Sequence, residues 1–147
     1  MQGQLFGKDR LAYLLAGNAT FTIVSKKTGM RFTYKVKAPR KDGKFLVDEP
    51  IRFVMVLCGP DNTADFQYFG LMRNGVFEHA QRKTRITVEA PSSLAFRWFA
   101  ERVESDTLEF YHSGHCGRCG RLLSTPSSVS SGYGPECSSR MGLLATG

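Results

Sequence analysis

The stretch that decides the fold is Thr20-Phe-Thr-Ile-Val-Ser-Lys-Lys-Thr-Gly29-Met-Arg31-Phe-Thr-Tyr-Lys-Val-Lys37. Apolar and polar side chains alternate on both sides of the segment at 27–29, which has the composition of a tight turn. Successive side chains of a strand point to opposite faces of a sheet, so this pattern predicts a β-hairpin with one buried and one solvated face. Arg31, Lys35 and Lys37 fall together on the solvated face.

The rest of the chain continues this antiparallel pattern. An almost continuous apolar run at 51–58 predicts a central strand covered on both faces. Asn74-Gly75 predicts a two-residue hairpin turn between strands at 66–72 and 76–79. Helices are expected at 8–16 and 91–103, and shorter strands at 45–47, 86–88 and 108–111. The predicted fold class is α+β, with an antiparallel sheet of five or six strands and one packing helix.

Cysteines are concentrated near the C-terminus. Cys116 and Cys119 form a Cys-x-x-Cys turn, and 17 residues separate Cys119 from Cys137. Such a turn aims two thiolates at one point, as a tetrahedral zinc ion requires, and Pro135 is typical of a helix start that would favour the Cys137 thiolate. We therefore predict a structural Zn²⁺ site in a small zinc-ribbon-like or treble-clef-like module over residues 107–147, after an antiparallel α+β domain over residues 1–106.

Structural zinc is four-coordinate, so these three cysteines need one more ligand. His112 is favoured, because the three residues between it and Cys116 let the chain fold back. Cys58 and His115 stay open as alternatives, although Cys58 ends an apolar strand and free cysteine is common in cores. A catalytic zinc ion is disfavoured, since no His-x-Glu deaminase signature precedes the cysteines.

Charge indicates the kind of partner. The 147 residues include 20 Lys and Arg against 13 Asp and Glu, a net charge of +7. This excess favours a polyanion, above all nucleic acid. The candidate phosphate-binding residues are Arg31, Lys35 and Lys37 in the hairpin, Arg82, Lys83 and Arg85 in a later loop, and Arg118 and Arg121 in the cysteine segment.

Two tyrosines are candidate stacking platforms for bases, Tyr34 and Tyr68, although aromatic residues on alternating strands more often belong to a core. No catalytic constellation is present in the sequence. Asp61 and Asp65 have the context of a turn rather than of a catalytic metal site, so we do not expect an enzyme.

The sequence favours a reducing compartment. No apolar run approaches the ~18 residues of a membrane-spanning helix, and the N-terminal residues lack the order of a signal peptide. We therefore expect a cytoplasmic protein, in which clustered cysteines bind metal rather than form disulfides.

The cysteine segment resembles a domain of unknown function that is widespread in phage and prophage proteins. The shared features are the Cys116-Gly-Arg-Cys119-Gly-Arg knuckle, a Leu-Thr-x-Pro-x-Ser segment that begins here with Leu123-Ser124, and the closing Gly132-Tyr-Gly-Pro-Glu-Cys137. Residues 16–34 and 59–65 also resemble the N-terminal part of small phage proteins with this tail. The resemblance implies zinc binding, a histidine four positions before the first cysteine, and a phage-encoded or prophage-encoded protein in a host cell, but no activity.

Two functions are consistent with these observations. The first is a non-enzymatic, zinc-stabilised accessory protein that binds nucleic acid or a nucleoprotein complex through a basic surface. The alternative is an anti-defence, anti-CRISPR-like inhibitor that binds a host nuclease complex by protein–protein contact. Neither requires a membrane or a small-molecule substrate.

Overall fold

The computed structural model describes residues 3–60, 65–118, 123 and 131–133. Their elements are, in chain order, β1 (Gln4–Leu5), α1 (Asp9–Leu14), β2 (Asn18–Ser25), β3 (Arg31–Lys37), β4 (Arg40–Lys41), β5 (Lys44–Phe45), β6 (Ile51–Leu57), β7 (Phe66–Arg73), β8 (Val76–His79), the short 3₁₀ helix η1 (Gln81–Lys83), α2 (Pro91–Glu101) and β9 (Leu108–His112).

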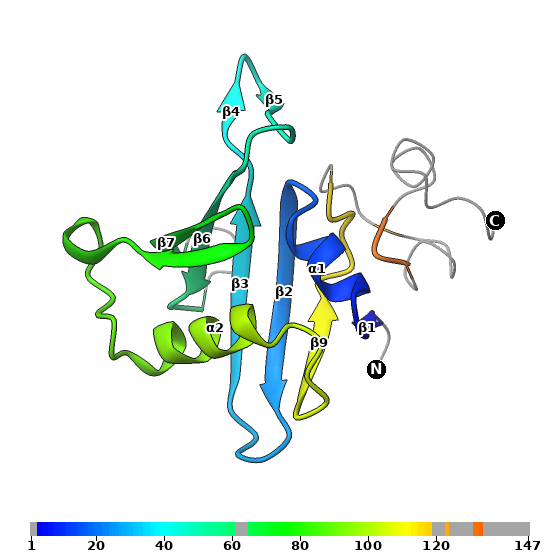
Figure 1. The fold of residues 1–147 in the computed structure, drawn as a ribbon, viewed down its shortest axis with the longest axis vertical. Coiled ribbons are helices and arrows are strands. Elements are labelled where there is room, and N and C mark those ends of the chain that lie inside the picture. The colour runs from blue at the N-terminus through cyan, green and yellow to red at the C-terminus, as the bar shows by residue number, and fades with distance from the viewer. Residues whose placement is uncertain (1–2, 61–64, 119–122, 124–130, 134–147) are drawn as a thin grey trace.

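Seven of these strands form one sheet in the order β1-β9-β2-β3-β6-β7-β8, and all neighbours are antiparallel. The strands β4 and β5 form a separate two-stranded ribbon that extends from one end of the sheet (Figure 1). The predicted α+β class with an antiparallel sheet is confirmed in outline, with seven strands instead of five or six. The two residues of β1 are too few to show a strand period in the sequence.

The hydrophobic core lies between the sheet and α2, whose C-terminal end lies in front of β3 in Figure 1. The rings of Phe21 and Phe110 stack at 4.5 Å between centroids, and both contact Phe99 of α2. Tyr34 is fully buried, and its hydroxyl donates a hydrogen bond to the Ser92 carbonyl at 2.8 Å. The core is thus an aromatic layer, and Tyr34 belongs to it rather than to a binding surface.

The predicted hairpins are confirmed. Phe21 pairs with Tyr34 and Thr22 with Thr33 between β2 and β3, as the alternation requires. Asn74 and Gly75 connect β7 to β8 with φ values of 52° and 83°. Both values lie in the left-handed region, which the two-residue turn favoured by Asn-Gly demands.

The prediction that β6 is covered on both faces is wrong for the described residues. Val54 and Val56 face the core, but Phe53 and Met55 project to the opposite face, where Phe53 is 37% exposed. We call this the open face: the side of the sheet opposite α2, which carries Thr20, Thr22, Thr33, Lys35, Lys37, Phe53, Met55, Leu57, Phe66 and Tyr68. An apolar run therefore marked a strand whose second face is only partly covered.

The strand predicted at 86–88 does not form. The Ile86 N–H bonds to the Thr84 hydroxyl at 3.1 Å, and the Ile86 carbonyl lies 2.8 Å from His79 Nε2. The Ser93 hydroxyl donates to the Thr87 carbonyl at 2.8 Å. Side chains occupy these backbone groups, so the segment remains a loop while Ile86 still packs against the core.

β9 lies between β1 and β2 in the sheet. It begins at Leu108, so the sheet includes the first residues of the segment assigned above to the zinc-binding module. His112 ends this strand and pairs with Phe21 of β2. The predicted metal segment therefore starts at the end of a strand that pairs with a neighbour on each side.

Two buried arginines connect the elements. Arg10 of α1 donates to the carbonyls of Leu5, Val103, Ser105 and Leu108 at 2.8–3.2 Å. Arg52 of β6 likewise donates only to carbonyls, at Leu15, Val47, Glu49 and Ile51. Burial lowers the pKa of both guanidinium groups. In the part of the chain that the structure describes, no helix is long and apolar enough to cross a bilayer.

Candidate functional site

The segment predicted to bind zinc begins where β9 ends. His112 is 5% exposed and Cys116 is fully buried. Cys119 and Cys137 lie outside the described residues, so the predicted ligand set stays a prediction. The described residues alone bring no three His, Cys, Asp or Glu side chains close enough to hold a metal ion.

Backbone contacts bring the two cysteine-bearing segments together. The Gly117 N–H donates to the Gly132 carbonyl at 2.9 Å, and the Leu123 N–H donates to the Gly114 carbonyl at 2.8 Å. Gly117 is close in sequence to Cys119, and Gly132 is close to Cys137. A zinc site built from both segments requires this kind of approach.

Tyr13 of α1 supports this junction from the core side. A Cβ atom added at Gly117 would lie 2.6 Å from its ring, and one added at Gly132 would lie 2.9 Å away. The Tyr13 hydroxyl lies 3.2 Å from the Thr20 carbonyl and 3.0 Å from the His115 carbonyl, and its one proton is shared between these two acceptors. Burial raises the pKa of Tyr13 above the ordinary value of a phenol, so this side chain remains a hydrogen-bond donor at alkaline pH too.

The structure bears on the choice of the fourth ligand. His112 Nδ1 accepts a hydrogen bond from the Gly114 N–H at 3.0 Å, which a metal ion at Nδ1 would replace. His115 is exposed and lines the polar hollow on the open face, where its Nδ1 lies 3.2 Å from the Ser113 hydroxyl.

Cys58 is far from this segment. It follows β6, and the strands β3 and β2 separate β6 from β9. Three strand spacings amount to about 14 Å, whereas two sulfurs on one zinc ion lie within about 5 Å of each other. Cys58 is therefore too distant to share a metal ion with Cys116. Burial raises the pKa of its thiol, and so does the nearby Asp65 carboxylate.

The open face contains a polar hollow of about 550 Å³. Lys35 and Lys37 of β3 line it, and Ser113 and His115 of the predicted zinc segment form one wall. None of the described residues around the hollow is acidic; they are Asn18, Thr20, Thr22, Thr33, Lys35, Lys37, Leu57, Phe66, Ser113 and His115. The hollow thus joins the basic strand to the cysteine segment.

The cations in the hollow are close to one another. Burial lowers the pKa of Lys37, and the neighbouring charges of Lys35 and Arg40 lower it further. The Lys35 ammonium lies 4.4 Å from the centre of the Phe66 ring. Like charges held this close create a positive field that an anion would relieve.

The second basic loop reaches the edge of the same sheet. Lys83 and Arg85 line a cavity of about 350 Å³ together with Gln67 and Tyr68 of β7. Arg82 is exposed in η1. The structure therefore places Lys83 and Arg85 beside Tyr68, one of the two candidate stacking residues.

The other predicted cations lie outside the polar hollow. Arg31 shares the open face with Lys35 and Lys37 by strand alternation. However, it starts β3 opposite Val24, and its charge acts on Tyr111 of β9. Arg118 follows the Gly117 turn, where its buried Nη1 has no hydrogen-bond partner among the described residues. Arg121 lies outside the described residues.

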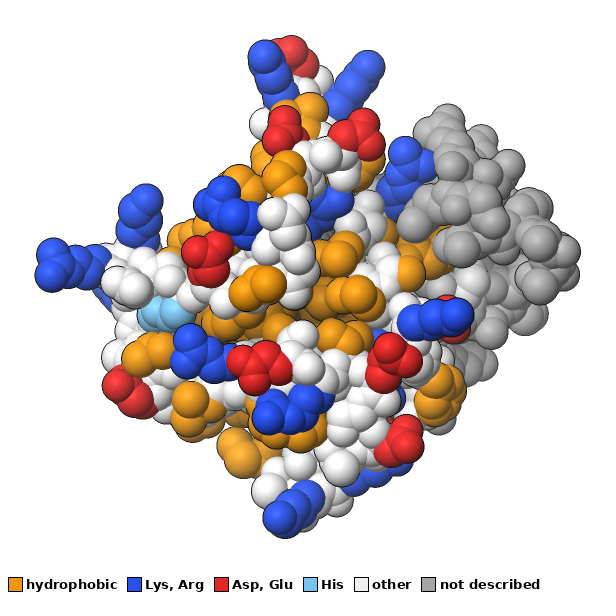
Figure 2. Space-filling model, in the orientation of Figure 1, with side chains coloured by type: hydrophobic (Ala, Val, Ile, Leu, Met, Phe, Trp, Pro, Cys, Tyr) orange, Lys and Arg blue, Asp and Glu red, His pale blue; other side chains and the backbone are white. Residues whose placement is uncertain are grey.

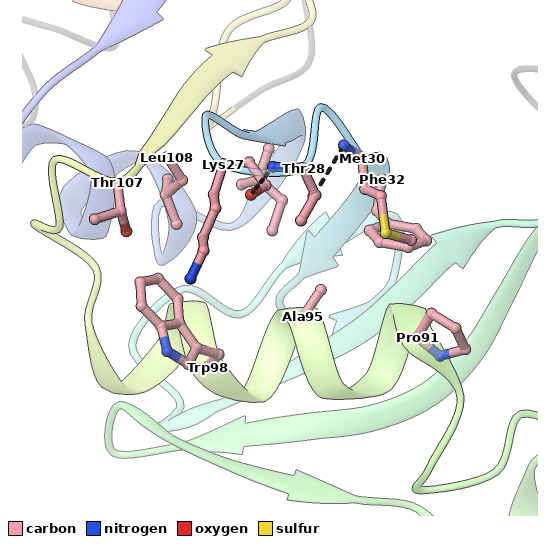
Figure 3. A pocket seen from close by; sticks show the side chains of 11 residues that line it. Lys27, Thr28, Met30, Phe32, Pro91, Ala95, Trp98, Thr107 and Leu108 are labelled. Carbon is pink, nitrogen blue, oxygen red and sulfur yellow. Dashed lines mark hydrogen bonds between the residues drawn. The ribbon is translucent and has the colours of Figure 1, made fainter.

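An apolar groove that sequence reasoning missed lies on the opposite side of the sheet, between α2 and the β2–β3 turn. It has a volume of about 570 Å³, and its lining includes Met30, Phe32, Ala95, Trp98 and Leu108. Figure 3 shows the side chains of Lys27 and Trp98 pointing toward each other at one end of it. On this side, acidic and basic side chains are mixed around a central hydrophobic area (Figure 2).

The helical spacing of α2 gave part of the signal for the groove. Leu94 and Trp98 fit the apolar face of the expected helix, yet they are 51% and 38% exposed. Phe96 and Phe99 supply the buried contacts instead. The sequence thus offered one indication of a second apolar surface: the helix has more apolar residues than the core uses, and Trp98 is one of them.

Comparison with known proteins adds one finding. Residues 106–142 match the model of DUF6011, a family of unknown function. No curated protein and no solved structure shows significant similarity to the chain. The match covers β9 and the cysteine segment, so Ser113 and His115 in the wall of the polar hollow belong to the part of the chain that is similar to this family.

Proposed function

We propose that this protein is a non-enzymatic, zinc-stabilised accessory protein, encoded by a phage or prophage, that binds nucleic acid or a nucleoprotein complex through its basic open face. The observation that carries the proposal is the polar hollow, which Lys35 and Lys37 line and which has no acidic residue among its described neighbours. Ammonium groups on such a surface release counterions from a phosphate backbone. The net charge of +7 acts in the same direction.

Zinc has a structural role in this proposal. Cys116, Cys119, Cys137 and His112 would hold the ion, whose binding energy becomes folding energy for the segment. The backbone of Arg118 would then be fixed, as would Ser113 and His115 in the wall of the hollow. Metal binding and nucleic-acid binding are therefore coupled through this wall.

The metal site is tested by metal analysis of the purified protein. We expect about one zinc per chain, as for a closed four-ligand site, and a large loss in Cys116→Ser, Cys119→Ser and His112→Ala. Cys58→Ser is the matched control and should keep its zinc, because β2 and β3 separate it from Cys116. Zinc retained by Cys116→Ser and Cys119→Ser would contradict the site.

Nucleic-acid binding is tested by mobility shift and fluorescence anisotropy over a salt series. Affinity should fall steeply with salt, and the double variant Lys35→Gln/Lys37→Gln should lower the slope of log K against log salt by about 0.7–0.9 per lost contact. Lys41→Gln/Lys44→Gln removes the same charge from the β4–β5 ribbon and should change binding much less. No shift at low salt would refute the proposal in its direct form.

The apolar groove favours the alternative, an anti-defence inhibitor that binds a host nuclease complex through protein contact. Trp98 and Met30 are 38% and 49% exposed beside a cavity that suits the apolar side chains of a partner. This function predicts that one host nuclease component is captured from lysate even after nuclease treatment. Trp98→Ser should abolish the capture, whereas Val76→Ser, at a 65% exposed position on β8, should not.

A further inference from the structure

The tertiary structure places two separate basic segments around one pair of aromatic residues. Lys35 of β3 lies over Phe66 of β7, with 4.4 Å between the ammonium and the ring centre. Lys83 and Arg85 line a cavity with Tyr68, two residues further along the same strand. Phe66 and Tyr68 pair with Leu57 and Met55 of β6, so both rings belong to the open face.

Both rings are half-buried rather than part of the core. Tyr68 meets the exposed Phe53 edge-on, with 6.1 Å between the ring centroids. Phe66 lines the polar hollow. Aromatic rings next to cations on a sheet face can bind single-stranded nucleic acid. The rings stack with unpaired bases, and the cations contact the phosphate of each nucleotide.

We propose that the open face binds single-stranded nucleic acid, with bases stacked on Phe66 and Tyr68 and phosphates held by Lys35 and Lys37 at one side and by Lys83 and Arg85 at the other. The base on Phe66 takes the place of the Lys35 ammonium, which moves from the ring to a phosphate. This inference rests on the proposed function and names the form of its ligand. The face from β2 to β7 spans three strand spacings, about 14 Å. A four-stranded sheet with such rings stacks two or three bases.

A duplex fits this surface less well. Its bases are already stacked on each other, so Phe66 and Tyr68 gain no partner from it, and only the phosphate contacts remain. The hollow also contains two hydroxyl groups, those of Thr22 and Thr33, which lie 2.7 Å apart. These groups can bond to exposed base edges or to sugar hydroxyls, which a single strand presents.

The carboxylates near this face are limited in their effect. Glu109 accepts hydrogen bonds from the Tyr111 hydroxyl and from Gln4 Nε2, on the β9 side of the face. The side chain of Asp65 lies against Gly59, at the connection between β6 and β7. A strand passing over Phe66 and Tyr68 therefore meets mainly the four cations named above.

The test compares short single-stranded DNA and RNA oligonucleotides with a duplex of the same sequence, by fluorescence anisotropy at fixed salt. We expect the single strands to bind more tightly, and Phe66→Leu and Tyr68→Leu to weaken their binding roughly tenfold each with an unchanged salt slope. Phe6→Leu, at a 62% exposed position outside the sheet face, is the matched aromatic control and should have no effect. Lys83→Gln is exposed, so it should weaken binding without affecting folding.

The outcomes separate this inference from the proposed function. Equal binding of duplex and single strand, with neutral Phe66→Leu and Tyr68→Leu, would overturn the single-strand inference and leave the proposed function standing. No binding of either form at low salt would overturn both. Trp98 supplies an internal check: it is the single tryptophan and lies on the α2 side, so its fluorescence should stay unchanged when the open face is occupied.

Discussion

At the scale of single residues, Gly117 and Gly132 both lie so close to the Tyr13 ring that neither position has room for a Cβ atom. Gly132 has a φ of 85°, and a Cβ atom there would lie 2.9 Å from the ring. Gly114 has almost the same φ, 86°, but nothing lies within 4 Å of its Cβ position. A side chain would strain the backbone equally at Gly132 and Gly114, but it would clash with the Tyr13 ring only at Gly132.

We therefore predict that Gly132→Ala destabilises the protein more than Gly114→Ala. The strain of a left-handed residue costs about 1–2 kcal/mol at both positions, and the clash adds to it only at Gly132. Urea unfolding of the two variants measures the difference. Equal losses would mean that Tyr13 moves aside freely and does not hold the Gly117–Gly132 junction.

At the scale of elements, Arg10 connects α1 to β1, to β9 and to the segment between α2 and β9. It is 2% exposed, and its donors face four backbone carbonyls. A buried carbonyl without a donor carries a desolvation penalty. Loss of the guanidinium would leave these four carbonyls without their donors, and that penalty is the main cost to stability.

Arg10→Met should therefore lower the free energy of unfolding by about 3 kcal/mol, since the side-chain volume is nearly kept while the carbonyls lose their donors. Arg97→Met, at an exposed position on α2, is the control and should change stability little. Denaturant titration of both variants measures the effect. An Arg10→Met variant as stable as its control would show that water replaces the guanidinium.

The elements also show where a sequence pattern is ambiguous. The run at 51–58 predicted a strand correctly, but an apolar side chain at Phe53 or Met55 does not reveal what covers it. The segment at 86–88 had strand-forming residues, yet His79, Thr84 and Ser93 bond to its backbone groups. These competing side chains lie within seven residues of the groups they bind, but strand propensity takes no account of hydrogen bonds from side chains to backbone groups.

At the scale of the whole molecule, buried phenols set the response to alkali. Burial raises the pKa of Tyr34 and of Tyr13 above the ordinary value, so both stay protonated in the folded protein. In the unfolded chain they ionise above pH ~10. Unfolding then releases protons. The two buried phenols therefore contribute their full stabilisation below pH ~10, and the free energy of unfolding falls as the pH rises above ~10.

The thermal midpoint should therefore drop steeply above pH ~10, together with a cooperative rise in tyrosinate absorbance. Lys37 acts in the opposite direction, because burial lowers its pKa, but the pKa values of two further phenols, Tyr111 and Tyr133, are raised as well. Tyr34→Phe should make the drop shallower. A midpoint that stays level while tyrosinate forms gradually would contradict the assignment of these phenols to the core.

Local pattern by itself determined the hairpin at 20–37, the Asn74-Gly75 turn, the helix that became α2 and the antiparallel α+β class, because strand and helix periods and turn residues act over a few neighbouring positions. It also placed Arg31, Lys35 and Lys37 on one face of a strand. Only the tertiary structure brought Lys83 and Arg85 beside Tyr68, assigned Tyr34 to the core, separated Cys58 from Cys116 and put Ser113 and His115 at the edge of the basic hollow. Those relations depend on the order of strands in the sheet, which joins residues far apart in the chain through pairing and burial that no local window contains.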